Sequence, residues 1–123
     1  MRVLILALVP LLAGCGSSIL GDDPATAIAV SVRKSPIQPV PREGEDNSAP
    51  VAGALVRVRA EGGGQLDRRT AADGTVRVPL APGRYEVEVR ECPGALALPP
   101  PAAVSVTRGH EEALTLMCDT GIR

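Results

Sequence analysis

Alternating apolar and polar positions run through most of the chain from Ile28 onward. This alternation has the period of a β-strand with one buried face. Residues 84–91 show it most clearly, because Tyr85, Val87 and Val89 fall on one side and charged residues on the other. The pattern predicts seven short strands, over 28–33, 54–59, 66–70, 75–80, 84–91, 104–106 and 114–118, in a small antiparallel Greek-key β-sandwich.

Two turns and one aromatic residue are expected to fix the strand connections. Asp73-Gly74 predicts a hairpin turn, since glycine adopts a positive φ without strain. Pro82-Gly83 predicts the turn before the strand at 84–91. Tyr85 is expected to point inward, with its hydroxyl bonded to a neighbouring loop as in a tyrosine corner. We interpret all five residues as structural.

The segment 35–50 differs from the rest, because it contains four prolines and the charged run 42–46. Proline cannot donate a hydrogen bond to a sheet ladder. We therefore expect a long exposed connection with its acidic residues in solvent.

The first fourteen residues have the pattern of an export signal. Residues 3–12 are apolar apart from one proline, a run too short to span a membrane as a helix, which needs about 20 apolar residues. The run ends in Leu12-Ala13-Gly14-Cys15, which resembles the lipobox of bacterial lipoproteins. The resemblance implies cleavage after Gly14 and attachment of lipid, palmitate included, to Cys15. An ordinary secretory signal with a chance cysteine is the alternative.

Residues 15–26 are predicted to be a lipidated cysteine and a flexible tether, because they are mostly small and polar, and 27–123 the sandwich domain. Membrane lipid is then a partner through acylation of Cys15, which replaces a spanning helix. In lipoproteins of diderm bacteria an aspartate after the cysteine favours the inner membrane. Gly16 stands there, so the resemblance favours the outer membrane if the host is diderm.

The two cysteines left after Cys15 are expected to pair with each other. Cys92 and Cys118 would lie in an exported, oxidising setting where pairing is the default. Free thiols or metal ligands are the alternative, but no other cysteine or histidine stands at ligand spacing. The bridge would hold the loop at 92–101 onto the last strand.

Composition limits the choice of partner. Without Arg2, twelve basic and fourteen acidic side chains remain, a net charge near −2 with no basic cluster, so a nucleic acid is not expected. Phe and Trp are absent and Tyr85 is the sole aromatic residue, which argues against a carbohydrate site built on exposed rings.

Four segments occur in an order that carries a resemblance to a known family: 50–54 (PVAGA), 70–74 (TAADG), 80–87 (LAPGRYEV) and 104–109 (VSVTRG). Together they are similar to the carboxypeptidase regulatory-like domain, a prealbumin-like Greek-key sandwich, from about Ile28 to Leu116. The last residues and 35–40 resemble a group of uncharacterised exported proteins with this fold, although cysteines often found in their upstream loop are missing here. The resemblance implies a non-catalytic accessory or binding module.

Residues for catalysis or a cofactor are not found. His110 is the sole histidine, which excludes a two-histidine zinc site and the histidine-rich sites of transthyretin-like hydrolases and intradiol dioxygenases. Ser105 lacks the turn of a serine nucleophile. Asp67 and Asp73 are too few carboxylates for calcium. We therefore expect no enzyme activity, no metal and no cofactor.

Two functions follow. The first is a lipid-anchored structural or protein-interaction module that docks onto another envelope protein through strand edges or proline-rich loops. The alternative is a carrier of a small ligand or peptide in a prealbumin-like groove, which would require an apolar groove.

Overall fold

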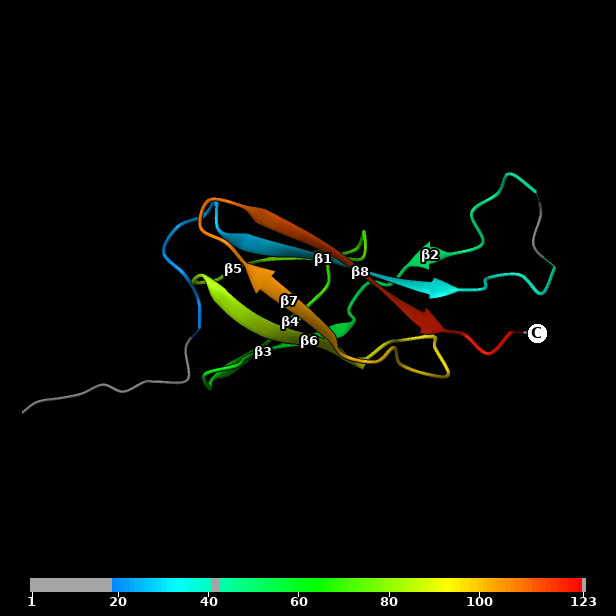
Figure 1. Ribbon diagram of the computed structural model, residues 1–123. Helices are drawn as coiled ribbons and strands as arrows, with labels where there is room; N and C mark the ends of the chain where they lie inside the picture. Colours follow the sequence, from blue (N-terminus) through cyan, green and yellow to red (C-terminus); the bar gives the residue numbers. More distant parts are fainter. Residues whose placement is uncertain (1–18, 41–42, 123) are drawn as a thin grey trace, which may run out of the picture.

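The computed structural model describes residues 19–40 and 43–122, and over these the chain forms eight β-strands (Figure 1). Every segment predicted to be a strand is one, and the eighth strand is a two-residue piece within the proline-rich segment. The strands are β1 (Ala27–Ser35), β2 (Ala49–Pro50), β3 (Leu55–Ala60), β4 (Gln65–Arg69), β5 (Thr75–Pro79), β6 (Gly83–Glu91), β7 (Ala102–Val106) and β8 (Glu111–Asp119). None of the described residues forms a helix long and apolar enough to cross a membrane.

The strands form two four-stranded sheets, which confirms the predicted sandwich. One sheet has the order β4-β3-β6-β7, with every pair antiparallel. In the other sheet β1 is central. On one side β1 pairs antiparallel with β5 along 27–31 and with β2 at 33–34. On its other side it pairs with β8. The connections from β4 to β5, β5 to β6 and β7 to β8 cross between the sheets.

The pair β1–β8 is parallel over nine residues, where an antiparallel arrangement was expected. The turn between β7 and β8 determines this direction. The backbone N–H of Gly109 donates to Thr26 Oγ1 at 2.8 Å, and the N–H of Ala27 donates to the carbonyl of His110 at 3.2 Å. Both strands therefore start at the same end of the sheet.

The core lies between the sheets and is aliphatic. Side chains predicted to point inward, such as Val56, Val58 and Val87, are fully buried, and their neighbours along each strand face outward. Twist and close packing of β-branched residues replace the bulk that aromatic rings usually supply. The largest fully buried side chains are Ile28, Leu80, Val30, Val32, Val56, Val58, Val78 and Val87.

Residues 19–26 pack against the sandwich, where a flexible tether was predicted. Ile19 is buried, Leu20 forms a β-bridge with Leu80, and the N–H of Gly21 donates to the carbonyl of Pro79 at 3.2 Å. The ordered domain thus begins at or before Ile19. Gly14 and Cys15, with the predicted signal and the first part of the tether, lie outside the described residues.

Candidate functional site

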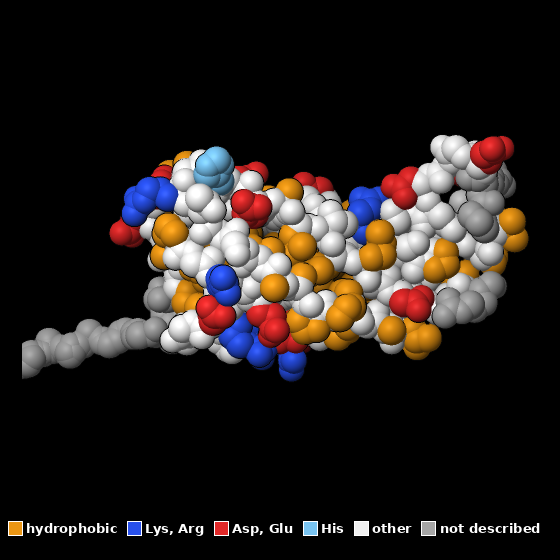
Figure 2. Space-filling model, in the orientation of Figure 1, with side chains coloured by type: hydrophobic (Ala, Val, Ile, Leu, Met, Phe, Trp, Pro, Cys, Tyr) orange, Lys and Arg blue, Asp and Glu red, His pale blue; other side chains and the backbone are white. Residues whose placement is uncertain are grey.

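Exposed apolar side chains gather at one end of the sandwich, which we call the distal end because Ile19 lies at the other (Figure 1). The distal end consists of the loop 36–48, the loop 92–101 and the C-terminal residues 120–122. Figure 2 shows hydrophobic side chains at this end of the molecule. Five large apolar residues here are at least 36% exposed: Ile37, Val40, Leu96, Leu98 and Ile122.

One asparagine orders the loop 36–48. Asn47 Oδ1 accepts hydrogen bonds from the N–H groups of Ile37 (3.0 Å) and Gln38 (2.9 Å), and its Nδ2 donates to the carbonyl of Gln38 at 3.2 Å. The carbonyl of Asn47 also accepts from Ser35 Oγ. The segment predicted as a long exposed connection is therefore held in shape by a side chain that the sequence pattern did not single out.

The disulfide Cys92–Cys118 holds the loop 92–101 onto β8, as predicted. Both cysteines are buried, with Cα atoms 6.8 Å apart. Further along the loop, Ala97 forms an antiparallel bridge with Asp119 through two hydrogen bonds of 3.0 Å. The loop is thus attached to the end of β8 at two points.

The C-terminal residues join the two loops into one surface. Thr120 Oγ1 donates to the carbonyl of Pro36 at 2.6 Å, which ties the C-terminus to the first loop. Leu96 from the second loop packs directly over Gly121, where a Cβ atom would collide with it. The distal end is therefore a fixed apolar surface built from three separate segments.

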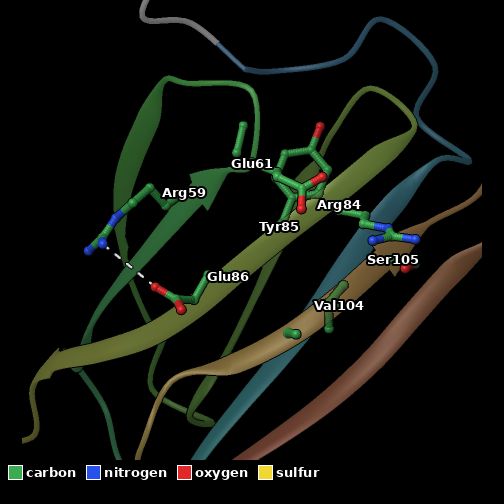
Figure 3. Close-up of a pocket in the computed structure, with 9 residues that line it drawn as sticks. Arg59, Glu61, Arg84, Tyr85, Glu86, Val104 and Ser105 are labelled. Atoms are coloured by element: carbon green, nitrogen blue, oxygen red, sulfur yellow. Dashed lines mark ion pairs between the residues drawn. The ribbon is translucent and has the colours of Figure 1, made fainter.

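Tyr85 lies where the sequence placed it, facing inward beside the turn at 82–83. Its hydroxyl donates to the carbonyl of Ala81 at 2.5 Å, and burial raises the pKa of this hydroxyl. A cavity of about 480 Å³ lies next to it, between β3, β6 and β7 (Figure 3). Its rim carries the charged residues Arg59, Glu61, Arg84 and Glu86, with Arg59 and Glu86 paired at 3.6 Å. Its lining thus combines these charged groups with the apolar side chains of Ala60, Ala103 and Val104.

The outer face of the sheet carries a network of ion pairs across β4, β3 and β6. Arg57 on β3 binds Asp67 on β4 through two hydrogen bonds of 2.9 and 3.1 Å, and this contact lowers the pKa of the Asp67 carboxyl. Arg59 pairs with Glu88 on β6, and Arg69 with Glu91 at 3.2 Å. Because the charges on this face satisfy one another, it offers little net charge to a partner.

The turn at Asp73-Gly74 has the expected structural role. Asp73 Oδ1 accepts from the hydroxyl (2.7 Å) and the N–H (3.1 Å) of Thr75, and both bonds lower the pKa of the carboxyl. Gly74 has a φ of +80° and is packed against Pro50, so a side chain would not fit. Pro82 lies at a bend directly before β6, and Gly83 is the first residue of that strand.

The residues considered for catalysis or metal binding do not converge. Asp67 lies on β4 and Asp73 in the turn before β5, in different sheets. His110 is exposed in the turn before β8, and Ser105 is exposed on β7. Over residues 19–40 and 43–122 no three His, Cys, Asp or Glu side chains group closely enough to hold a metal ion.

A scan of protein-family models finds no match to this chain, and a search of curated proteins also finds none. Several solved structures with a similar fold are bacterial pilins. GBS52, the minor pilin of Streptococcus agalactiae, aligns with a TM-score of 0.60 and 14% identity, covering 76% of this chain and 44% of the pilin. BcpA, the major pilin subunit of Bacillus cereus, aligns with a TM-score of 0.57 and 16% identity, covering 75% and 28%.

A third pilin, the pilus 2b backbone protein of group B streptococcus, aligns with a TM-score of 0.53 and 14% identity. This chain covers 42% of that protein, so in all three cases it matches less than half of the pilin. At these identities the likeness shows the fold alone. That fold is consistent with the prealbumin-like sandwich that the sequence resemblance implied.

Proposed function

We propose that this chain is a lipid-anchored, non-catalytic protein-interaction module of the cell envelope, related to the carboxypeptidase regulatory-like domains. Lipid on Cys15, with acyl chains such as palmitate, provides the anchor, in the outer membrane if the host is diderm. The pattern of residues 1–15 supports the anchor, and the sandwich without a convergent catalytic group among its described residues supports a binding role.

The observation that carries the docking role is the apolar distal end. With Cys15 as the anchor, only residues 16–18 separate it from the packed Ile19. Four residues span at most about 14 Å. The sandwich would then sit close to the membrane by its Ile19 end, with the distal end directed away from the lipid. Large apolar side chains in that position have no lipid to enter, and apolar patches of this kind mark protein-interaction sites.

Crosslinking in intact cells tests both parts of the proposal. The full-length protein is crosslinked and its partners are identified, with Cys15→Ala as the mislocalised control. We expect a discrete envelope protein with the unmodified chain and its loss with Cys15→Ala. Mass spectrometry of the mature N-terminus reports lipidation independently. A protein that is not lipidated, or that captures only background, would overturn the corresponding part.

The distal end is tested by a matched pair of surface changes. Val40 and Leu98 are 71% and 49% exposed at the distal end, and Leu20 is 46% exposed at the opposite end. We expect Val40→Ser with Leu98→Ser to abolish the crosslink and Leu20→Ser to leave it intact. The reverse pattern would place the docking surface elsewhere.

A further inference from the structure

A two-sheet sandwich ends in strands whose outer backbone groups lack a sheet neighbour. Such an edge pairs readily with another chain unless it is short, charged, interrupted by proline or covered. Here the edges are β4 and β7 in one sheet, and in the other β8 on one side and β5 with the two-residue β2 on the opposite side. Three of these edges are blocked along most of their length, whereas β8 carries its one core-facing charge, Glu112, next to its first residue and leaves residues 113–117 uncharged.

The outer edge of β5 is covered at both ends. At its last residue, the carbonyl of Pro79 accepts from the N–H of Gly21, so the N-terminal segment lies along the strand. At its first residue, the N–H of Thr75 donates to Asp73 Oδ1 at 3.1 Å and its carbonyl accepts from the N–H of Ala71 at 2.9 Å. Little of this edge is left for a partner.

The edges β4 and β7 are short and protected by residue type. β4 has five residues, and Arg68 lies opposite the buried Val56, so a charged side chain stands on the core-facing side of the strand. An inward-pointing charge on an edge strand opposes the addition of another strand. β7 also has five residues and follows three consecutive prolines, 99–101.

β8 is a nine-residue edge without proline. The carbonyl of His110 bonds toward β1, whereas the N–H and carbonyl of Asp119 bond away from it, to Ala97. Because the N–H and carbonyl of successive residues point to alternate edges of a strand, these backbone groups point to the outer edge at the odd-numbered residues of β8. These are Glu111, Ala113, Thr115 and Met117, and within the described chain the structure gives their outward backbone groups no partner.

The side chains along this edge also favour contact. Ala113 and Thr115 are small and uncharged, Met117 is 43% exposed, and Leu114 is only half-buried on the core-facing side. Val104 of β7, also half-buried, packs against the same core. Figure 2 shows a group of hydrophobic side chains in the middle of this face of the molecule, where β7 and β8 lie in Figure 1.

We propose that the outer edge of β8 pairs antiparallel with the same edge of a second copy of this chain, about a two-fold axis at Leu114. In this register Glu111 lies opposite Met117 of the copy and Ala113 lies opposite Thr115. In every pair that exchanges hydrogen bonds, both residues then have their backbone N–H and carbonyl pointing to the outer edge of β8. All four open N–H groups and all four open carbonyls of each copy are used, and the two sheets become one continuous sheet.

The charges of β8 are what point to a second copy. With the axis at Leu114, the acidic residues Glu111 and Glu112 lie opposite the uncharged Met117 and Leu116. With the axis at Thr115, Glu111 would lie opposite Asp119, and like charges directly opposite each other are destabilising. Asp119 is also already bridged to Ala97. An axis at Ala113 would leave Met117 unpaired. Only the register with the axis at Leu114 thus pairs residues 111–117 with the same residues of a second copy without placing like charges opposite each other.

Antiparallel pairing sets the orientation of the dimer. Ile19 and the start of β8 lie at the same end of the sandwich, as Figure 1 shows. The two N-termini would therefore leave at opposite ends of the long axis, and so would the two distal ends. Two copies that are both anchored through Cys15 in one membrane cannot adopt this arrangement, because their tethers of at most about 14 Å start at opposite ends of the dimer. The inference therefore concerns copies that are not both held in the same membrane, and its test is separate from that of the proposed function.

Cysteine crosslinking in intact cells tests the register, in the full-length chain carrying Cys15→Ala so that the proposed anchor does not hold the two copies in one orientation. Leu114 lies opposite itself in a non-hydrogen-bonded pair, where Cα atoms are about 4.5 Å apart and a disulfide can form. We expect Leu114→Cys to give a covalent dimer on a non-reducing gel, and Ala113→Cys to link to Thr115→Cys when the two variants are expressed together. Gln65→Cys, exposed on the blocked edge β4, is the control and should stay monomeric.

The oligomeric state of the purified protein provides the second measurement. Thr115→Pro removes one outward N–H without touching the pairing with β1, and should convert the dimer to a monomer whose melting still depends on the disulfide. A wild-type chain that is monomeric at all concentrations and does not crosslink through Leu114→Cys would overturn the proposal. So would a Leu114→Cys adduct with a protein of different mass, which would assign this edge to another partner.

Discussion

Thr70 holds two backbone segments together through one buried hydroxyl. Its Oγ1 donates to the carbonyl of Val51 at 2.5 Å and accepts from the N–H of Ala54 at 2.9 Å. All three residues are at most 5% exposed. The contact attaches the entry to β3 to the end of β4, so it fixes where the second sheet begins. The hydroxyl is thus part of the fold although Thr70 directly follows an exposed edge strand.

Two substitutions separate the hydroxyl from the methyl group of this residue. Thr70→Val keeps the shape but leaves a buried N–H and a buried carbonyl without a partner. Each such group costs about 1–3 kcal/mol, so for the two groups we expect a loss of about 2–6 kcal/mol. Thr70→Ser keeps the hydroxyl and loses one methyl group, at about 1 kcal/mol.

Urea unfolding followed by circular dichroism measures both losses, with unchanged m-values expected because the same surface is exposed on unfolding. For a domain of this size the Thr70→Val loss corresponds to a fall in Tm of about 10–30 °C. Thr107→Val, at an exposed site, should change little. If Thr70→Ser were less stable than Thr70→Val, packing of the methyl group would be the main role of this residue and the hydrogen-bond argument would be refuted.

Three further predictions concern the turn, the disulfide and acid stability. Gly74→Ala should cost at least about 2 kcal/mol more than Gly109→Ala in thermal unfolding. Both glycines have positive φ, but a Cβ collides with neighbouring atoms only at the first, so equal losses would contradict the argument. Cys92→Ala with Cys118→Ala should lower the free energy of unfolding by about 3–4 kcal/mol, and reductant should then have no further effect. Asp67→Asn should weaken stability at neutral pH but not in acid. The hydrogen bonds from Arg57 lower the pKa of the Asp67 carboxyl in the folded protein. The contribution of this carboxyl to the free energy of unfolding is therefore full above its ordinary pKa near 4 and is lost as the pH falls through the folded pKa. Parallel pH profiles of stability for the two proteins would disprove this.

The local pattern of the sequence determined the strands and their faces. Alternation is a property of neighbouring residues, so the inward positions of Val56, Val87 and Tyr85 could be predicted without knowing which strands pair. The pairing of Cys92 with Cys118 could be predicted too, because the predicted lipidation of Cys15 leaves two cysteines. The turn at Asp73-Gly74 follows from the backbone freedom of glycine.

Only the tertiary structure decided which strands pair and which distant segments contact each other. Alternation is identical for a parallel and an antiparallel strand, so it could not give the direction of β8 beside β1. The packing of residues 19–26 on β5, and the role of Asn47, depend on hydrogen bonds between segments that the sequence pattern treats separately. Whether a strand edge is open depends on what covers it, and for β5 that cover comes from about sixty residues away. A periodic pattern records which side of each strand is buried, whereas edges and loop surfaces are set by long-range contacts that leave no period in the sequence.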